Sequence, residues 1–121
     1  MHRAVLFIVT ALLFASCNKK PVESYDVRGQ FITLSPGKSP ATILFHHENM
    51  PEFKNDNGEK VGMMSMQMPF AVEKSRLIDG IKAGDKAELH VEVRIGKSPK
   101  LWVSGVKKLP EDTPLTLTNP Y

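Results

Sequence analysis

Residues 88–95 read Glu-Leu-His-Val-Glu-Val-Arg-Ile, and this stretch decides the fold class. Its apolar residues alternate with charged residues and one histidine, His90. Because successive side chains of an extended strand point to opposite faces, the alternation predicts a strand with one buried face and one solvated face. His90 falls on the solvated face, and we assign it no function. A half-buried strand is stable only within a larger sheet, so the rest of the chain must supply more strands.

Four other stretches have the pattern of strands. Residues 25–34 alternate with a change of face near Gly29, where we expect a bulge or a sharp bend. In residues 41–47 the alternation is strict, and it places His47 on the apolar, inward face. The two remaining strands are predicted at residues 63–70 and 101–106.

Two of these strands contain residues that disturb a β-ladder. Pro69 cannot donate a backbone hydrogen bond, so it should end or bend the third strand at an edge or a bulge. Gly105 should break the fifth strand. Trp102 lies on the face opposite Leu101 and Val103, where we expect it to pack at the surface or in a second layer.

The segment between the third and fourth strands predicts a short helix. Residues 72–81 carry Leu77, Ile78 and Ile81 at helical spacing, and Gly80 closes the pattern. The chain thus has three strands, a helix and two strands. That order is typical of an all-β fold, a small five-stranded closed barrel of the OB-fold type with one short helix between strands 3 and 4.

The start of the chain predicts export. Residues 1–16 combine a short basic start, an apolar run and small residues before Cys17, the only cysteine. The apolar run is too short to cross a bilayer and predicts a secretory signal. It resembles a bacterial lipoprotein signal, which implies that Cys17 is lipidated and becomes the first residue of the mature chain. The alternative is an ordinary cleaved signal that leaves a free thiol.

These features divide the chain into four parts. Residues 1–16 are the lipoprotein signal peptide, and residues 17–24 are the lipidated cysteine and a polar tether. Residues 25–109 form the barrel, which is the one domain that 121 residues allow here. Residues 110–121 contain prolines and predict an extended, loosely held tail.

The composition excludes several classes of function. Sixteen basic residues stand against 13 acidic ones, a formal charge of +3, without the dense basic stripe that nucleic-acid binding needs. A single cysteine provides no disulfide framework. No Ser/His/Asp set, no pair of acid and base carboxylates and no phosphate-binding loop stands out, so we do not expect an enzyme.

Residues 63–68 hold four of the six methionines of the chain. In a strand that includes the whole stretch, Met64, Met66 and Met68 share one face, and Met63 points the other way. Two interpretations stay open: the methionines fill a core, although thioethers specify packing loosely, or they form a soft-metal site. In either case we expect Met64 to face the core.

A metal site in an oxidising compartment favours thioethers and neutral imidazole over thiols, which oxidise or pair. Thioether sulfur is soft and selects Cu(I), and by the same softness Ag(I), over Zn(II) or Mg(II). Met66 and Met68 can both reach one ion if the barrel brings His47 beside them. Without such neighbours, a lone inward histidine is more often a satisfied core residue.

Residues 25–109 resemble the CusF-type family of periplasmic copper and silver binding proteins. These are small OB barrels with a histidine at the end of the second strand and a methionine pair before a phenylalanine. The segments that carry the resemblance are Phe45-His46-His47-Glu48, Met50-Pro51-Glu52-Phe53 and Met66-Gln67-Met68-Pro69-Phe70, with Leu77, Gly80, Ile81, Gly84 and Asp85 in the helix and turn. Residues 54–62 depart from the family pattern and resemble an insertion, which we expect to form an exposed loop or a small hairpin.

The resemblance implies a metal site. By position, His47, Met66 and Met68 match the family's ligands for Cu(I) and Ag(I). Met63 falls where members place a tryptophan or a methionine that caps the ion, so it is a fourth ligand or cap if the strand begins after it. The residues whose part in the site stays open are Met50 and Met64.

The resemblance also implies a function. We expect an extracytoplasmic Cu(I) and Ag(I) binding protein or metallochaperone in copper handling or efflux. It should be a monomer, lipid-anchored in the cell envelope and facing the periplasm, that exchanges the ion with an efflux or copper-assembly protein and binds no nucleic acid. The alternative is a structural or protein-interaction barrel lipoprotein of the envelope that binds no metal.

Overall fold

The structure is a computed structural model, and it describes residues 23–118. Its regular elements are β1 (Glu23–Ser35), β2 (Ala41–His47), β3 (Met66–Val72), the 3-10 helix η2 (Ser75–Ile78), β4 (Lys86–Val93) and β5 (Leu101–Lys108). The predicted signal peptide, Cys17, most of the tether and the end of the tail lie outside the described residues. Within residues 23–118, no helix is long and apolar enough to cross a membrane.

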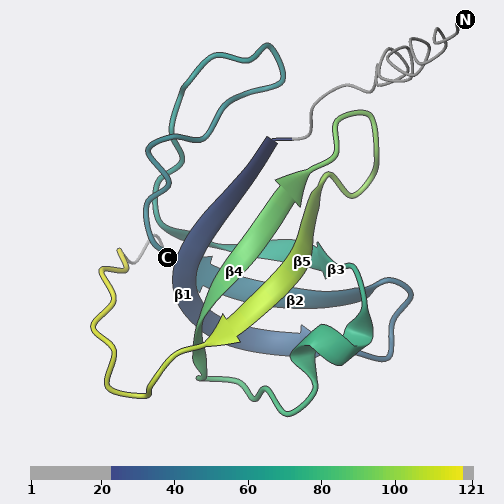
Figure 1. The fold of residues 1–121 in the computed structure, drawn as a ribbon, viewed down its shortest axis with the longest axis vertical. Helices are drawn as coiled ribbons and strands as arrows, with labels where there is room; N and C mark the ends of the chain where they lie inside the picture. The colour runs from purple at the N-terminus through teal and green to yellow at the C-terminus, as the bar shows by residue number, and fades with distance from the viewer. Residues whose placement is uncertain (1–22, 119–121) are drawn as a thin grey trace, which may run out of the picture.

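The strands close into a barrel in the order β1-β2-β3-β5-β4 (Figure 1). β1 is long enough to pair with two strands, and it pairs antiparallel with both β2 and β4. β3 and β5 meet in a short parallel ladder at Ala71 and Val72, which closes the circle. The predicted fold, an all-β five-stranded closed barrel, is confirmed. The predicted helix is present as the short 3-10 helix η2, with Ile78 buried.

The bend in β1 comes from a bulge. The register of β1 against β2 shifts between Phe31 and Thr33, which leaves Ile32 as the extra residue. The inward face continues through Gly29 to Phe31, both of which are buried. The predicted bulge therefore exists, but its predicted position near Gly29 is wrong.

Gly29 instead allows two strands to approach closely. It lies directly opposite His47 in the β1–β2 ladder. A Cβ atom at Gly29 would overlap the backbone oxygen of His46 and lie 2.6 Å from the ring of Phe45. A residue with any side chain would therefore push β1 away from the end of β2.

β3 begins later and ends later than the predicted stretch of residues 63–70. It starts at Met66 and continues through Pro69 to Val72. Pro69 is tolerated because β3 pairs only with β2 until Ala71, where β5 joins on the other side. Of the alternatives predicted for Pro69, an end of the strand is wrong, and a position at an edge is confirmed because only β2 pairs with β3 there.

The last two strands also differ from their predicted bounds. β4 ends at Val93, and Ile95 lies outside it with half of its surface exposed. β5 runs through Gly105 to Lys108, because a register shift beside His90 absorbs the predicted break.

Trp102 and His90 lie on the outside of the barrel, as predicted. The Trp102 indole N–H donates to the backbone oxygen of Pro99 at 2.8 Å, and the guanidinium of Arg94 lies 4.7 Å from the ring centroid. The Nδ1 of His90 lies 2.8 Å from a carboxylate oxygen of Asp26. Both side chains therefore have structural contacts on the outer face.

Aromatic and branched aliphatic side chains fill the barrel. Phe31 meets Phe45 edge-on with ring centroids 5.0 Å apart, and Phe45 meets Phe70 in the same way at 6.3 Å. Edge-to-face pairs are the favoured geometry of aromatic rings. The other buried core residues are Val27, Ala41, Ile43, Met50, Val72, Ile78, Ala87, Leu89, Val91 and Val103.

The predicted insertion, residues 54–62, forms a small hairpin outside the barrel. Its two arms meet in a β-bridge between Lys54 and Lys60. At its base, Met50 and Met63 form a second bridge. The expectation of a small hairpin is confirmed, and its ends are held together before the chain reaches β3.

The segment after β5 is extended, but it is not loosely held. Hydrogen bonds tie residues 113–118 to side chains of β1, β2 and β4 and to Ser65. In Figure 1 this yellow segment leaves β5 and returns along the barrel to the place where β2 ends and β3 begins. The prediction of a loosely held tail is wrong for these residues.

Replacing Gly29 with alanine should lower the free energy of unfolding by about 3 kcal/mol, because the added Cβ has no room beside β2. Thermal melting followed by circular dichroism should show a fall of about 10 °C or more for a domain of this size. Gly37→Ala is the matched control, since nothing lies within 4 Å of an added Cβ there. Equal melting temperatures for the two variants would contradict the close approach of β1 and β2.

Candidate functional site

His47 is the last residue of β2 and is fully buried. The β2–β3 register places it directly opposite Met66. Directly opposed residues of an antiparallel ladder have their side chains on the same face, with Cβ atoms about 4.5–5.5 Å apart. The predicted inward position of His47 is confirmed, and the ladder brings it beside one of the predicted ligands.

The hydrogen bond of the His47 ring decides which nitrogen is free. Nδ1 lies 2.6 Å from the backbone oxygen of Glu48. A carbonyl oxygen only accepts, so Nδ1 carries the proton, and Nε2 of the neutral ring presents a lone pair. Nε2 is buried and has no hydrogen-bond partner among the described residues. One ring nitrogen bonded to a carbonyl and the other without a partner among the described residues is also the arrangement of a metal-ligating histidine.

Burial has the largest effect on the pKa of His47 and lowers it, because the charged ring would lose its hydration. The bond to the Glu48 carbonyl raises the pKa by less, and neighbouring His46 lowers it further. The ring is therefore neutral near neutral pH, the form in which imidazole binds a metal.

Glu48 is held from several sides. Its carboxylate accepts two hydrogen bonds from Arg28, at 3.0 and 3.1 Å, and one from the backbone N–H of Thr116 at 2.7 Å. Burial acts to raise the pKa of this carboxyl, but the bonds from Arg28 and Thr116 outweigh it and hold the pKa below its usual range. The backbone N–H of Glu48 donates to the Arg28 oxygen at 2.9 Å. Glu48 is thus a fixed acceptor for Nδ1 of His47.

Met66 and Met68 lie two residues apart on β3, and both are partly buried. Met68 is opposite Phe45 and packs against the core. Phe70, two residues further on the same face, meets the His47 ring edge-on with centroids 6.4 Å apart. The two predicted thioethers and the imidazole therefore lie on one face of two paired strands.

Met63 precedes β3, so the condition set for it as a fourth ligand or cap is met. Its bridge with Met50 has both backbone hydrogen bonds, at 2.7 and 2.9 Å. Met63 is partly buried and packs against the core, whereas Met50 is only 6% exposed. Met50 is therefore mainly a core residue beneath the bridge.

Met64 is 70% exposed, and the prediction that it faces the core is wrong. The β2–β3 ladder ends with the pair of His47 and Met66, so the alternation of a strand does not extend back to Met64. In place of a ladder bond, the backbone N–H of Ser65 donates to the side-chain oxygen of Asn49 at 2.7 Å. Met64 is therefore the methionine of this stretch that faces solvent.

Three polar residues that were not predicted from the sequence, Glu48, Asn49 and Ser65, hold the candidate site together. Glu48 accepts the Nδ1 proton of His47, and Asn49 joins Ser65 across the end of the ladder. In the sequence each resembles an ordinary loop residue. The one available signal is that Glu48 and Ser65 each stand next to a predicted ligand, His47 or Met66.

The donors gathered here suit a soft ion. Within residues 23–118, no group of three or more His, Cys, Asp or Glu side chains is arranged to hold a metal, but thioethers fall outside that set of donors. The ladder places His47, Met66 and Met68 on one face of two paired strands, and their side chains offer an imidazole nitrogen and two thioethers. Such a set fits Cu(I) or Ag(I) better than Zn(II) or Mg(II).

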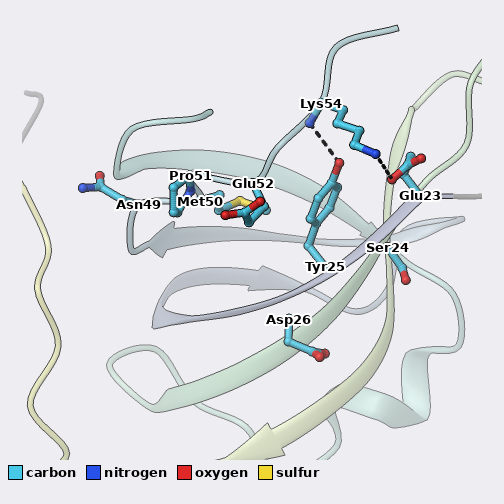
Figure 2. Close-up of a pocket in the computed structure, with 9 residues that line it drawn as sticks. All are labelled: Glu23, Ser24, Tyr25, Asp26, Asn49, Met50, Pro51, Glu52 and Lys54. Atoms are coloured by element: carbon cyan, nitrogen blue, oxygen red, sulfur yellow. Dashed lines mark hydrogen bonds and ion pairs between the residues drawn. The ribbon is translucent and has the colours of Figure 1, made fainter. Parts of the chain in front are cut away.

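A surface groove of about 540 Å³ runs along the start of β1 and residues 49–54 (Figure 2). Within it the backbone N–H of Lys54 donates to the Tyr25 hydroxyl at 2.9 Å, and Nζ of Lys54 lies 4.0 Å from a Glu23 oxygen. Met50 lines the groove, whereas the residues predicted for the metal site do not; these are His47, Met63, Met66 and Met68. The groove is therefore separate from the predicted metal site.

The sequence matches no protein-family model, and no similar curated protein or solved structure was found. The residues and geometry of this chain are therefore the basis for assigning it a function.

Acid should destabilise the metal-free protein in part through His47. Because its pKa is lower in the folded state, the unfolded chain binds a proton between the two pKa values that the folded chain does not. The free energy of unfolding therefore falls as the pH drops below the ordinary histidine range. Urea denaturation at about pH 7 and about pH 5 measures this fall, which should be smaller for His47→Gln because the other groups are unchanged. Equal falls in the two proteins would contradict a buried, neutral ring.

Proposed function

We propose that this protein binds Cu(I), and by the same chemistry Ag(I), outside the cytoplasm and exchanges the ion with another protein. The observation that carries the proposal is the buried Nε2 of His47, which has no hydrogen-bond partner within residues 23–118, in a residue that the ladder pairs with Met66. A buried polar atom without a partner costs about 1–3 kcal/mol, so an interior that retains one calls for a reason such as a ligand. A soft cation is the ligand that matches the neighbouring thioether.

In this proposal His47 supplies one nitrogen, Met66 and Met68 supply two sulfurs, and Met63 is the fourth ligand or cap. All four donors are neutral, and the thioethers favour a soft monovalent ion over Zn(II) or Mg(II). The hydrogen bond from Nδ1 of His47 to Glu48 orients the ring and sets its tautomer before an ion arrives.

The resemblance of residues 25–109 to the CusF-type family supports the same function. The histidine ends β2, and the methionine pair lies on β3 before Phe70, which are the places that the family's pattern requires. Met66 and Met68 are only partly buried, so ligands of another protein can approach the ion from the thioether side. This arrangement suits a protein that holds and passes an ion, rather than an enzyme that activates water.

The predicted lipoprotein signal gives the proposal its cellular setting. With Cys17 lipidated, the barrel would stand at the cell envelope and face the periplasm. The partner would then be a copper efflux or copper-assembly protein that reaches the same compartment.

A Met66→Ala, Met68→Ala double variant should bind Cu(I) at least about 100-fold more weakly, because it loses both thioethers of the proposed set. Anaerobic competition with a Cu(I) chelator of known affinity measures the change. Met64→Ala is the matched control, since it removes an exposed methionine of the same stretch, and its affinity should stay within about threefold of the parent. Undiminished binding by the double variant would overturn the ligand assignment.

Cu(I) should also raise the melting temperature. At a free concentration of 100 times the Kd, binding to the native state adds about 2.7 kcal/mol, or a rise of about 10 °C or more. The double variant should show no such rise, and Zn(II) should produce little in either protein. If Cu(I) leaves the parent protein's melting temperature unchanged, the structural or protein-interaction barrel becomes the better description.

A further inference from the structure

The segment of residues 113–118, here called the C-terminal strap, lies against the outside of the barrel (Figure 1). Its exposure alternates, which indicates an extended chain with one face toward the barrel. The partly buried residues are Thr113, Leu115 and Leu117, and the exposed residues are Pro114, Thr116 and Thr118.

The first part of the strap is fixed to β4 and β1. Nζ of Lys86 donates to the backbone oxygen of Thr113 at 2.7 Å, and Nη2 of Arg28 lies 3.5 Å from the backbone oxygen of Pro114. The same Arg28 also binds the Glu48 carboxylate. Arg28 therefore contacts both the strap and Glu48, and the backbone oxygen of Glu48 is the acceptor for the His47 ring.

The second part of the strap contacts the residues that flank the two opposed ligands. The backbone N–H of Thr116 donates to the Glu48 carboxylate at 2.7 Å, next to His47. Thr118 makes two bonds to Ser65, next to Met66: its N–H donates to the Ser65 hydroxyl, and its own hydroxyl donates to the Ser65 backbone oxygen, both at 3.1 Å.

His46 completes this set of contacts. It lies on the outer face of β2, yet it is only 9% exposed. Its Nε2 is 2.6 Å from the backbone oxygen of Thr118, so the strap reaches both sides of His47 in the chain. Thr118 thus joins His46, which precedes His47, to Ser65, which precedes Met66. These contacts lie on the outside of the barrel, whereas His47 is buried inside it.

We infer that the strap is a positioning element for the soft-metal site, an inference that rests on the proposed function. By joining His46 and Glu48 at the end of β2 to Ser65 at the start of β3, it fixes the separation of His47 and Met66 where the ladder would otherwise fray. Docking of the strap and binding of the ion then strengthen each other, and by linkage each does so by the same factor. Undocking of the strap is accordingly a route by which the ion is released.

Hydrogen exchange on the full-length protein tests the coupling without any mutation. Saturating Cu(I) should slow exchange of the Thr116 and Thr118 amides, which donate to Glu48 and Ser65. A chain that ends at Asp112 lacks the strap and should bind Cu(I) about tenfold more weakly than the full-length chain. By linkage, Cu(I) should slow exchange of the two strap amides in the full-length chain by the same factor. A chain that ends at Thr118 keeps the strap and is the length control, with unchanged affinity.

Point variants separate positioning from a general loss of stability. Thr118→Val removes the hydroxyl bond to Ser65 and should weaken Cu(I) binding by about threefold, whereas Thr118→Ser should restore it. Thr116→Val is the matched control, because its bond to Glu48 comes from the backbone. The methyl NMR signal of Met66 should shift in the metal-free Thr118→Val protein and not in the control.

The outcomes distinguish this inference from the proposed function. If the parent protein binds Cu(I) but the two strap amides exchange at the same rate with and without the ion, the inference is wrong and the proposed function stands. Equal Cu(I) affinities for the chains ending at Asp112 and Thr118 would overturn it in the same way. If the parent protein does not bind Cu(I) at all, the proposed function fails, and the inference fails with it.

Discussion

The register between β2 and β3 is the constraint on which the candidate site depends. It sets His47 opposite Met66, and a shift of one residue would turn one of the two to the outer face. Several contacts hold this register at its open end. Gly29 lets β1 pack closely beside His47, and Asn49 captures the N–H of Ser65 where the ladder stops. The barrel therefore does more than bury a core, because the pairing of β2 with β3 decides which side chains lie opposite one another.

The fold was predictable from the sequence because it depends on local alternation and turn residues. Each predicted strand exists, and the inward position of His47 followed from a strict alternation that the ladder preserves. Strand ends were less predictable, since they depend on distant partners. Met64 was misplaced because the ladder stops at Met66, a limit set by a side chain from residue 49. The strap was missed for the same reason: Thr116 and Glu48 are 68 positions apart, and nothing in their local sequence pairs them.

The buried position of His47 has a cost in stability. An apolar residue in place of His47 would make the barrel more stable, because the lone pair of Nε2 is buried without a partner among the described residues. The contacts around the His47 ring oppose any rearrangement of the ring that would give Nε2 a hydrogen-bond partner. Nδ1 is held by the Glu48 carbonyl, and the ring edge packs at Phe70. A ring held in this way keeps Nδ1 on the Glu48 carbonyl and leaves Nε2 as the nitrogen without a partner among residues 23–118.

The hairpin of residues 54–62 lies beside the constrained end of the β2–β3 ladder. The bridge between Met50 and Met63 closes the hairpin at its base, so the separation of the two chain ends does not depend on the hairpin's length. Beyond the bridge, the bond between Asn49 and Ser65 restores the spacing that the β2–β3 ladder needs. Changes in the hairpin are thus separated from His47 and Met66 by two cross-connections. The geometry at His47 and Met66 is set by the ladder and its end contacts, and the hairpin can vary without moving these two residues.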